Sequence, residues 1–449
     1  MKTPICDFVA HYLKNSPLRL HMPGHKGKPI LGPETMDITE ISGADSLFHA
    51  DGIIAESEKN TGHLFGCHSF YSAEGSSLSI RAMLYLCTLY ANSKGTKPTI
   101  AAGRNAHKVF LSSAALLDFE IQWIYGEQNT TYLSCAITPK SLKYHLSTAC
   151  TLPTAVYITS PDSLGNMVNI TALSEVCKQY GVLLIVDNAH GAYLKFLNPS
   201  RHPIDLGADM CCDSAHKTFP VLTGGAYLHI SHTAPIIFKK HAKQAMGLFA
   251  STSPSYLVLE SLDNANAYLA HSYPSFLNSF IHTLQRFKNR LSTQGYHFYG
   301  DEPLKWTIDC KAYGYHGYDL AQYLSEHNII CEFSDPDYVV LMFTPEINMA
   351  ELKHLEATLQ TLPMRSAIQN ESAPLPIRRS PVISPRKAAL CVSETISIED
   401  AEGRILADPS VGCPPAVPIL VCGERIDRNA IEAFRYYGIS HCRVCCESN

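Results

Sequence analysis

The strongest constraint on the fold is an alternation, between about residues 60 and 230, of short apolar segments with longer stretches of helical periodicity. The apolar segments are KPTIAA (97–102), IQWIY (121–125), TAVYIT (154–159), VLLIVD (182–187), ADMCCD (208–213) and GAYLHI (225–230). Short, nearly continuous apolar strands of this kind are buried on both faces, which is typical of a parallel sheet covered by helices. The sequence therefore predicts an α/β fold with a large, mainly parallel sheet.

The flanking segments predict several parts around this sheet. Apolar residues at helical spacing predict a first helix that ends at NSP (15–17), and residues after 290 mix helices with strands such as YVVLMF (338–343). A proline-rich stretch without periodicity then separates a short C-terminal unit. The expected boundaries are an N-terminal segment (1–45), a large domain including helical 236–290 (46–290), a small α+β domain (291–370), a linker (371–387) and a C-terminal unit (388–449).

Charge and hydropathy exclude several classes of partner. The formal net charge is −5 and charged residues make up 17% of the chain, so no broad basic face is available for nucleic acid or for an anionic membrane. No apolar stretch is long enough to span a bilayer, and the N-terminus lacks the pattern of a secretory signal. We therefore expect a cytoplasmic protein that binds a small molecule, neither nucleic acid nor membrane.

The cysteines predict reduced thiols. Sixteen in 449 residues lie well below the density of a disulfide scaffold. The adjacent Cys211 and Cys212, and the CxxC spacing of Cys442, Cys445 and Cys446, offer metal ligands, but no second pair follows at matching spacing. A buried strand with small apolar thiols is therefore favoured over a metal site, and we expect no metal.

One lysine is notable for its position in this pattern. Lys217 follows the apolar segment 208–213, and Asp187 closes the segment 182–187. Ligands of an open α/β sheet bind beyond the carboxyl ends of its strands, so an acid and a lysine on adjacent strand ends can face one pocket. A lysine amine kept neutral by partial burial can form an imine. The alternative is a solvated loop lysine.

Pyridoxal 5'-phosphate (PLP) is a cofactor that uses such a pair. It requires a lysine for its aldehyde, an acid at its pyridine nitrogen and a turn of backbone N–H groups for its phosphate. The stretch YSAEGSSLSIRAML (71–84) supplies a turn of this kind, with Gly75, Ser76 and Ser77 opening an amphipathic helix. Taken alone, this turn is also explained as a plain capped helix start.

Six segments spread along the chain are informative as an ordered set. They are RLHMPGHKG (19–27), RNAHK (104–108), VDNAHGA (186–192), DSAHKTFPVLTGGAYLHI (213–230), TSPSY (252–256) and GRILADPSVGCPPAVPILVCGERI (403–426). In this order they resemble motifs of the bacterial ornithine/lysine/arginine decarboxylases, nearly end to end. The resemblance implies a PLP-dependent decarboxylase of the aspartate-aminotransferase fold (fold type I), with a seven-stranded large domain. It further implies the short form without an N-terminal wing domain, a homodimer, and a role in polyamine metabolism.

The resemblance also implies roles for matching residues. Lys217 resembles the Schiff-base lysine, Asp187 the partner of the ring nitrogen, and His107 the residue stacked on the ring face. Lys217 or His216 would return a proton to Cα. The further positions are Ala189 beneath the ring, His190 near its phenolic oxygen, Ser76, Ser77, Ser214 and His216 at the phosphate, and Thr252 and Ser253 at the phosphate of the partner subunit. Without the resemblance, His107 is better explained as a satisfied polar group at a strand end and His190 as a helix-start residue. Asp187, by contrast, needs a partner for its charge.

Candidates for substrate contacts are fewer. The resemblance places HMPGHKG near the active site, which makes His25 and Lys26 candidates, while a metal site there lacks further ligands at recognisable spacing. The distal cation of a basic substrate requires an acid. Glu40, Asp45 and Asp51 are the acids available, and each is also explained as part of a solvated acidic loop.

Departures from the family pattern leave the substrate open. FHADG (48–52) departs from the commoner His–His–Pro pattern, Cys413 replaces an aromatic residue, and Ala416 replaces a glycine. Arginine, lysine and ornithine are therefore all compatible. Two other functions also stay open, namely another fold-type I PLP reaction such as transamination or carbon–carbon cleavage, and a non-catalytic regulatory homologue.

Overall fold

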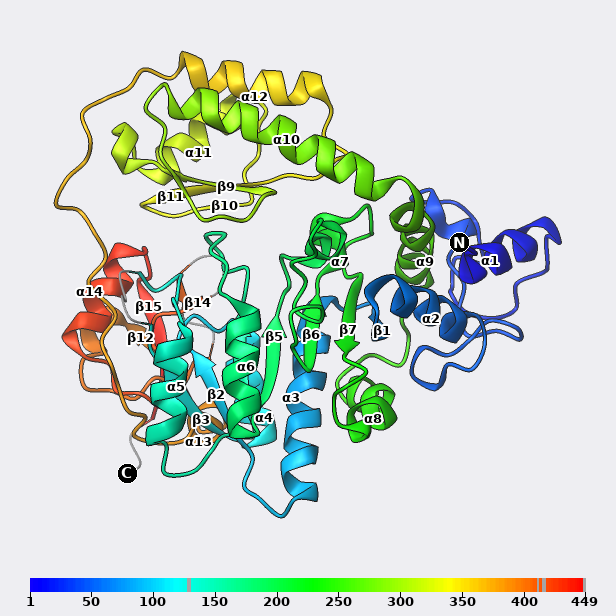
Figure 1. Ribbon diagram of the computed structural model, residues 1–449, viewed down its shortest axis with the longest axis horizontal. Helices are drawn as coiled ribbons and strands as arrows, with labels where there is room; N and C mark the ends of the chain where they lie inside the picture. Colours follow the sequence, from blue (N-terminus) through cyan, green and yellow to red (C-terminus); the bar gives the residue numbers. More distant parts are fainter. Residues whose placement is uncertain (127–130, 410–411, 414–416, 447–449) are drawn as a thin grey trace. The chain divides into compact units, whose positions relative to one another are not determined.

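The computed structural model describes residues 1–126, 131–409, 412–413 and 417–446, and its largest sheet has seven strands (Figure 1). They are β1 (His68–Ser72), β2 (Thr99–Gly103), β3 (Glu120–Ile124), β4 (Ala155–Thr159), β5 (Leu183–Asp187), β6 (Met210–Asp213) and β7 (Ala226–Ile230). Their order is β1-β7-β6-β5-β4-β2-β3. The pairs β2–β3, β2–β4 and β5–β6 are parallel, whereas β7 is antiparallel to both β1 and β6. The predicted large, mainly parallel sheet is confirmed.

Each of the six apolar segments overlaps one strand, with β2 and β3 each extending one residue beyond their segments, and β1 is the strand that this pattern misses. Its sequence HSFYS alternates half-buried and buried residues over its first four positions. β1 is also the terminal strand of the sheet, next to β7 only. A strand at the edge lacks the continuous apolar run by which we identified the others.

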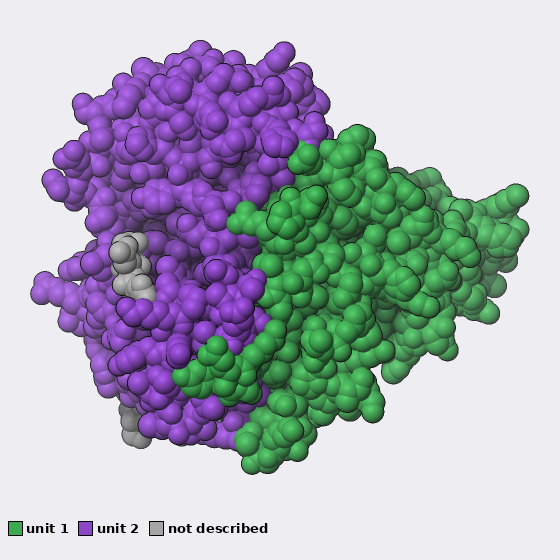
Figure 2. Space-filling model, viewed as in Figure 1, with its two compact units in different colours: residues 1–96, 177–278 green, residues 97–176, 279–449 purple. Residues whose placement is uncertain are grey.

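The chain forms two compact units, residues 1–96 with 177–278 and residues 97–176 with 279–449 (Figure 2). In the first unit, α3 (Gly75–Ser93) packs against β7 and α8 (Ile236–Gly247). The helix expected at the N-terminus is α1 (Pro4–Lys14), and it packs on α2 (Ile53–Phe65) and α9 (Tyr256–His271). The short helix α7 (Ala215–Thr218) follows β6 directly.

The second unit contains a four-stranded antiparallel sheet of order β10-β11-β9-β8. Its strands are β8 (Phe298–Tyr299), β9 (Lys305–Asp309), β10 (Phe333–Ser334) and β11 (Tyr338–Met342). The helix α11 (Gly317–Glu326) packs on β11, which gives this part the α+β character expected from the sequence. The helices α4 (Lys108–Leu117), α5 (Pro139–Thr148), α6 (Ile170–Tyr180), α10 (Tyr273–Ser292), α12 (Met349–Thr361), α13 (Pro385–Ala389) and α14 (Arg428–Tyr436) complete the described set.

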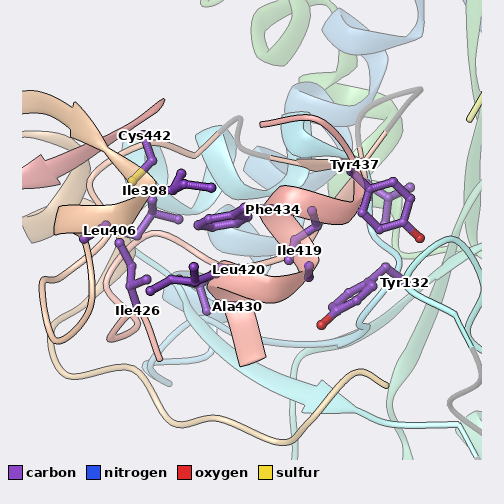
Figure 3. Packing of buried hydrophobic residues seen from close by; sticks show 14 of the residues in the cluster. Tyr132, Ile398, Leu406, Ile419, Leu420, Ile426, Ala430, Phe434, Tyr437 and Cys442 are labelled. Atoms are coloured by element: carbon purple, nitrogen blue, oxygen red, sulfur yellow. The ribbon is translucent and has the colours of Figure 1, made fainter. Parts of the chain in front are cut away.

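The C-terminal residues form an apolar core around α14 (Figure 3). Phe434 of α14 is fully buried there, and Tyr132, Leu133 and Leu164, which precede the four-stranded sheet in sequence, join the same cluster. Small strand pairs accompany the cluster, β12 (Ser393–Ser397) with β15 (His441–Cys445) and β13 (Gly412–Cys413) with β14 (Val417–Pro418). The expected C-terminal strand with thiols is therefore present as β15. Within the described ranges, no helix combines the length and apolar character needed to cross a membrane.

Candidate functional site

Lys217 lies in α7, the single helical turn that connects β6 to the loop before β7. Its side chain is partly buried, and its Nζ lies 2.9 Å from Nε2 of His190, within hydrogen-bond distance. The backbone N–H of Lys217 donates to the carbonyl of Ser214 at 3.1 Å. Lys217 is therefore held at the carboxyl end of β6, where the sequence places it.

Asp187 is the last residue of β5 and pairs in register with Cys212 of β6. It is 3% exposed, and its Oδ1 accepts the N–H of Ala189 at 3.2 Å and the thiol of Cys212 at 3.5 Å. Because β5 and β6 are adjacent and parallel, the acid and the lysine occupy neighbouring strand ends of the same edge, as expected.

The N-terminus of α3 lies at the same end of the first unit. The Oγ of Ser214, which follows β6, donates to the Oγ of Ser76 at 2.8 Å. Gly75 has a φ of +70°, and a Cβ added there would meet no atom within 4 Å. The first N–H groups of a helix lack partners within the helix, so this open N-terminus with Ser76 and Ser77 can bind an anion.

Three further residues are expected at the phosphate, namely His216, Thr252 and Ser253. His216 is fixed by two contacts with the carbonyl of Gly225, 2.9 Å from its Nδ1 and 3.1 Å from its backbone N. The exposed segment with Thr252 and Ser253 precedes α9. Its neighbour Ser251 donates a backbone hydrogen bond of 2.7 Å to the carboxylate of Glu74, the N-cap residue of α3. Thr252 and Ser253 thus directly follow the residue that contacts the N-terminus of α3. Their action on a partner subunit stays a prediction.

His107 belongs to the second unit, where it is the N-cap of α4. Its Nδ1 accepts the N–H of Val109 at 3.2 Å, so the hydrogen bond fixes the ring and leaves the proton of the neutral imidazole on Nε2. The structure thus gives His107 a local capping role, and its stacking on a cofactor ring stays a prediction.

The candidate substrate residues have diverse surroundings in the first unit. Nε2 of His25 lies 3.2 Å from Oδ2 of Asp37, and Nζ of Lys26 donates to the carbonyl of His21 at 2.6 Å. Glu40 and Asp51 are exposed. Contact of His25, Lys26, Glu40 and Asp51 with a substrate therefore stays a prediction.

Asp45 differs from the solvated loop residue that the sequence allows. It is 6% exposed, and its carboxylate accepts backbone N–H groups at the start of α2. The donors are Ser46, Asp51, Gly52, Ile54 and Ala55. Asp45 therefore caps α2, which occupies the acceptor positions that a substrate cation would need.

Of the two departures in the C-terminal motif, Cys413 ends β13, and Ala416 lies outside the described residues.

Sequence reasoning missed a fully buried polar cluster beneath the strand ends. Oδ2 of Asp213 lies 2.9 Å from Nε2 of His202 and 3.3 Å from Nε2 of His229, and all three residues are 0% exposed. Burial alone would raise the pKa of Asp213, but the two histidines outweigh it and hold this pKa well below its usual range. No motif or spacing indicated that His202 and His229 meet one carboxylate.

The groups gathered in the first unit fit PLP. They comprise a partly buried lysine amine at Lys217, a buried carboxylate at Asp187, and an open helix N-terminus with serine hydroxyls. These are the imine-forming, proton-holding and phosphate-binding groups that the cofactor needs. Gly75 leaves room for a ligand, since no heavy atom fills the position of its missing side chain.

Comparison with known proteins agrees with this chemistry. Residues 3–305 match the family described as Orn/Lys/Arg decarboxylase, major domain, and residues 376–441 match its C-terminal domain. The chain is 28% identical to the uncharacterized protein YaaO of Bacillus subtilis, covering 96% of this chain and 93% of that protein. It is 27% identical to an arginine decarboxylase of Bacillus anthracis, covering 97% and 92%.

A solved structure shares the fold. The constitutive lysine decarboxylase of E. coli superimposes with a TM-score of 0.76 at 17% identity, over 99% of this chain and 82% of that one. The family match spans most of the large sheet and includes the segments of Lys217 and Asp187. This chain therefore belongs to the Orn/Lys/Arg decarboxylase family, and it is a PLP-dependent amino-acid decarboxylase.

Proposed function

We propose that this protein decarboxylates a basic L-amino acid, namely arginine, lysine or ornithine, at a site centred on Lys217. The observation that carries the proposal is the placement of Lys217 and Asp187 at the carboxyl ends of two adjacent parallel strands, beside the serine-lined N-terminus of α3. The names of two relatives, arginine decarboxylase and lysine decarboxylase, support the substrate class.

In the proposed site, Lys217 holds the cofactor through its amine, and Ser76, Ser77 and Ser214 bind the phosphate. When bound, PLP supplies an electron sink for the electron pair that remains as CO2 leaves. The carboxylate of Asp187, which is buried at the end of β5, would hold a proton at the ring nitrogen. The N–H of Ala189 orients this carboxylate by donating to Oδ1.

The proton that replaces the carboxylate at Cα has two candidate donors, Lys217 and His216. The 2.9 Å contact between Lys217 Nζ and His190 Nε2 favours Lys217, because the imidazole can accept a proton from the amine and return it. His216 is tied through Nδ1 to the carbonyl of Gly225, which fixes its ring orientation. We therefore assign proton return to Lys217, with His190 as its proton partner.

The distal cation of the substrate is proposed to meet Glu40 or Asp51, since Asp45 already caps α2. His25 and Lys26 remain candidates for contacts with the substrate carboxylate. Assembly as a homodimer with Thr252 and Ser253 acting on the partner, a location in the cytoplasm, and a supply of amines to polyamine metabolism are further parts of the proposal. They are supported by the resemblance to the family.

Reduction with borohydride tests the centre of the proposal. Borohydride should fix the cofactor on the peptide that contains Lys217, and peptide mass spectrometry identifies the attachment site. Lys217→Ala should lose the fixed cofactor and about 10²–10⁴-fold of the decarboxylation rate, as expected for loss of a group that transfers the proton. The matched control is Lys240→Ala, an exposed lysine of α8, which should retain both. Cofactor fixed on another residue would refute the proposed site.

A substrate panel tests the reaction. Arginine, lysine and ornithine are incubated separately with the holoenzyme, and CO2 and the corresponding amine are measured. One of the three should give equal amounts of both products, without a keto acid. A keto acid as main product would instead indicate transamination.

A further inference from the structure

The buried cluster around Asp213 involves residues from five segments of the first unit. Beyond its contacts with His202 and His229, the carboxylate of Asp213 accepts a hydrogen bond of 2.7 Å at Oδ1 from Nδ2 of Asn188. On the other side of the cluster, Nδ1 of His229 lies 2.8 Å from Oγ of Ser69, and Phe65 stacks on its ring at 4.3 Å between centroids. Asn188 and both histidines are 0% exposed, so water cannot replace any of these contacts.

Asn188 connects this cluster to the turn that carries the candidate catalytic groups. It lies between Asp187 and Ala189, its N–H donates to the carbonyl of Cys212 at 3.1 Å, and its carbonyl accepts the N–H of Gly191 at 2.8 Å. The side chain of Asn188 is also closely packed. Its Oδ1 lies against Gly191, where an added Cβ would approach it to 2.1 Å. The hydrogen bond to Asp213 is therefore the side-chain contact that fixes the position of Asn188 within the turn.

The charge of Asp213 strengthens this contact. A carboxylate accepts a hydrogen bond more strongly than a neutral group does, and the adjacent imidazoles of His202 and His229 lower the pKa of Asp213. A buried carboxylate without a neighbouring cation would cost several kcal/mol of folding free energy. The cluster thus maintains an ionised acceptor at a place from which solvent is excluded.

We infer that Asp213 is a positioning residue: through its hydrogen bond to Asn188 it fixes the 187–190 turn, and with it the carboxylate of Asp187 and the imidazole of His190. The inference rests on the proposed function for the roles of those two residues. Asp213 itself touches neither cofactor nor substrate in this scheme, and His202 and His229 act by holding its carboxylate.

A double-mutant cycle on the PLP-loaded protein tests the inference. Asn188→Ala removes the donor, and Asp213→Leu removes the acceptor at similar branching. Each variant should lower kcat by about tenfold or more while KM changes by less than about threefold. Each should also alter the visible circular dichroism of the bound cofactor, which reports its orientation. Because both act through one hydrogen bond, the double variant should be no slower than the slower single variant.

Two further variants separate positioning from stability. Asp213→Asn keeps an oxygen acceptor without the charge, so its loss of kcat should be measurable but smaller than that of Asn188→Ala. This comparison replaces Asp213→Leu if that variant does not fold. The matched control is Asp335→Leu in the second unit, a fully buried carboxylate that accepts the N–H groups of Asp337 and Tyr338. It should lower the unfolding temperature and leave the visible circular dichroism unchanged.

Three results would overturn the inference. The first is a double variant whose loss of kcat equals the product of the single losses. The second is unchanged visible circular dichroism in Asn188→Ala. The third is one equivalent of zinc in the purified protein that is lost in His202→Ala, because ligand atoms of His202, Cys211 and Asp213 lie within 4.8 Å of one another and would then form a metal site. All three leave the borohydride result on Lys217 intact, whereas cofactor fixed elsewhere refutes the proposed function and this inference together.

Discussion

The buried ion pair between Arg104 and Glu424 gives the sharpest prediction about stability. Nη2 of Arg104 donates to Oε2 of Glu424 at 2.9 Å, and the side chains are 10% and 0% exposed. The same Oε2 accepts the N–H of Val421 at 2.9 Å. The guanidinium also lies over the ring of Trp123, 4.9 Å from its centroid. Both residues belong to the second unit, so their contact joins the segment after β2 to the C-terminal residues.

Removing the cation alone should be costly. Arg104→Met leaves the carboxylate of Glu424 buried without its counter-charge, and breaking a buried pair in this way costs about 3–5 kcal/mol. The double variant Arg104→Met with Glu424→Gln leaves no buried charge, and its free energy of unfolding should lie within about 1 kcal/mol of the unmodified protein, since replacing a whole buried pair is often nearly neutral. The predicted loss of stability in Arg104→Met therefore comes from the carboxylate of Glu424 that is left without its counter-charge.

Tryptophan fluorescence in urea measures this effect selectively. The chain has two tryptophans, Trp123 and Trp306, and both lie in the second unit. With a slope of about 3 kcal/mol per molar urea, the predicted loss lowers the midpoint by about 1 M or more. The matched control is Arg435→Met, which removes the cation of the exposed Arg435–Glu399 pair and should change the midpoint much less. The reasoning is refuted if both substitutions shift the midpoint equally, or if the double variant is as unstable as Arg104→Met.

Three more predictions concern single residues. Phe434→Ala should cost about 3–5 kcal/mol in the same urea assay, because it empties the fully buried centre of the C-terminal cluster; a loss below about 1 kcal/mol would show that the cluster closes over the gap. Burial, with Asp37 and Asp263 adding to it, raises the pKa of Glu260 from 4.5 to about 8. The folded state therefore binds the extra proton, and stability falls as the pH rises from 4.5 to 8. Glu260→Gln should thus unfold at a higher temperature than the unmodified protein at pH 9 and at the same temperature at pH 4; a gain at both would contradict the titration. Gly191→Ala should cost about 1–3 kcal/mol in thermal unfolding, since its Cβ would lie 2.1 Å from Oδ1 of Asn188, and an unaffected unfolding temperature would contradict that close approach.

The strands of the central sheet were predictable because burial on both faces leaves a direct mark on the sequence. Each of the six apolar segments overlaps a strand, and the strand ends at Asp187 and Asp213 match the predicted ends. The position of Lys217 after β6 followed from the same pattern, without knowledge of the tertiary structure. β1 was not predicted, since two of its five residues are only half-buried and its sequence lacks a continuous apolar run.

The role of Asp45 and the cluster around Asp213 show what a linear pattern cannot supply. Asp45 was expected at a substrate or in solvent, but the chain folds so that its carboxylate accepts N–H groups up to ten residues ahead. Asp213 meets His202 and His229, which lie 11 residues before it and 16 residues after it in sequence. Neither separation is a known ligand or helix spacing, so only the tertiary arrangement brings these groups together.

The Arg104–Glu424 pair shows how the C-terminal residues are connected to the segment that carries His107. Arg104 lies three residues before His107, in the segment between β2 and α4, and its counter-charge is 320 residues away in the C-terminal motif. The apolar cluster follows the same division, because Tyr132 and Leu133 pack with Ile398 and Phe434. A core built from both segments cannot form if either segment is missing. Loss of one segment would expose the apolar side chains of the other to water and would leave one charge of the ion pair without its partner. The C-terminal unit is therefore part of the framework that holds the segment carrying His107.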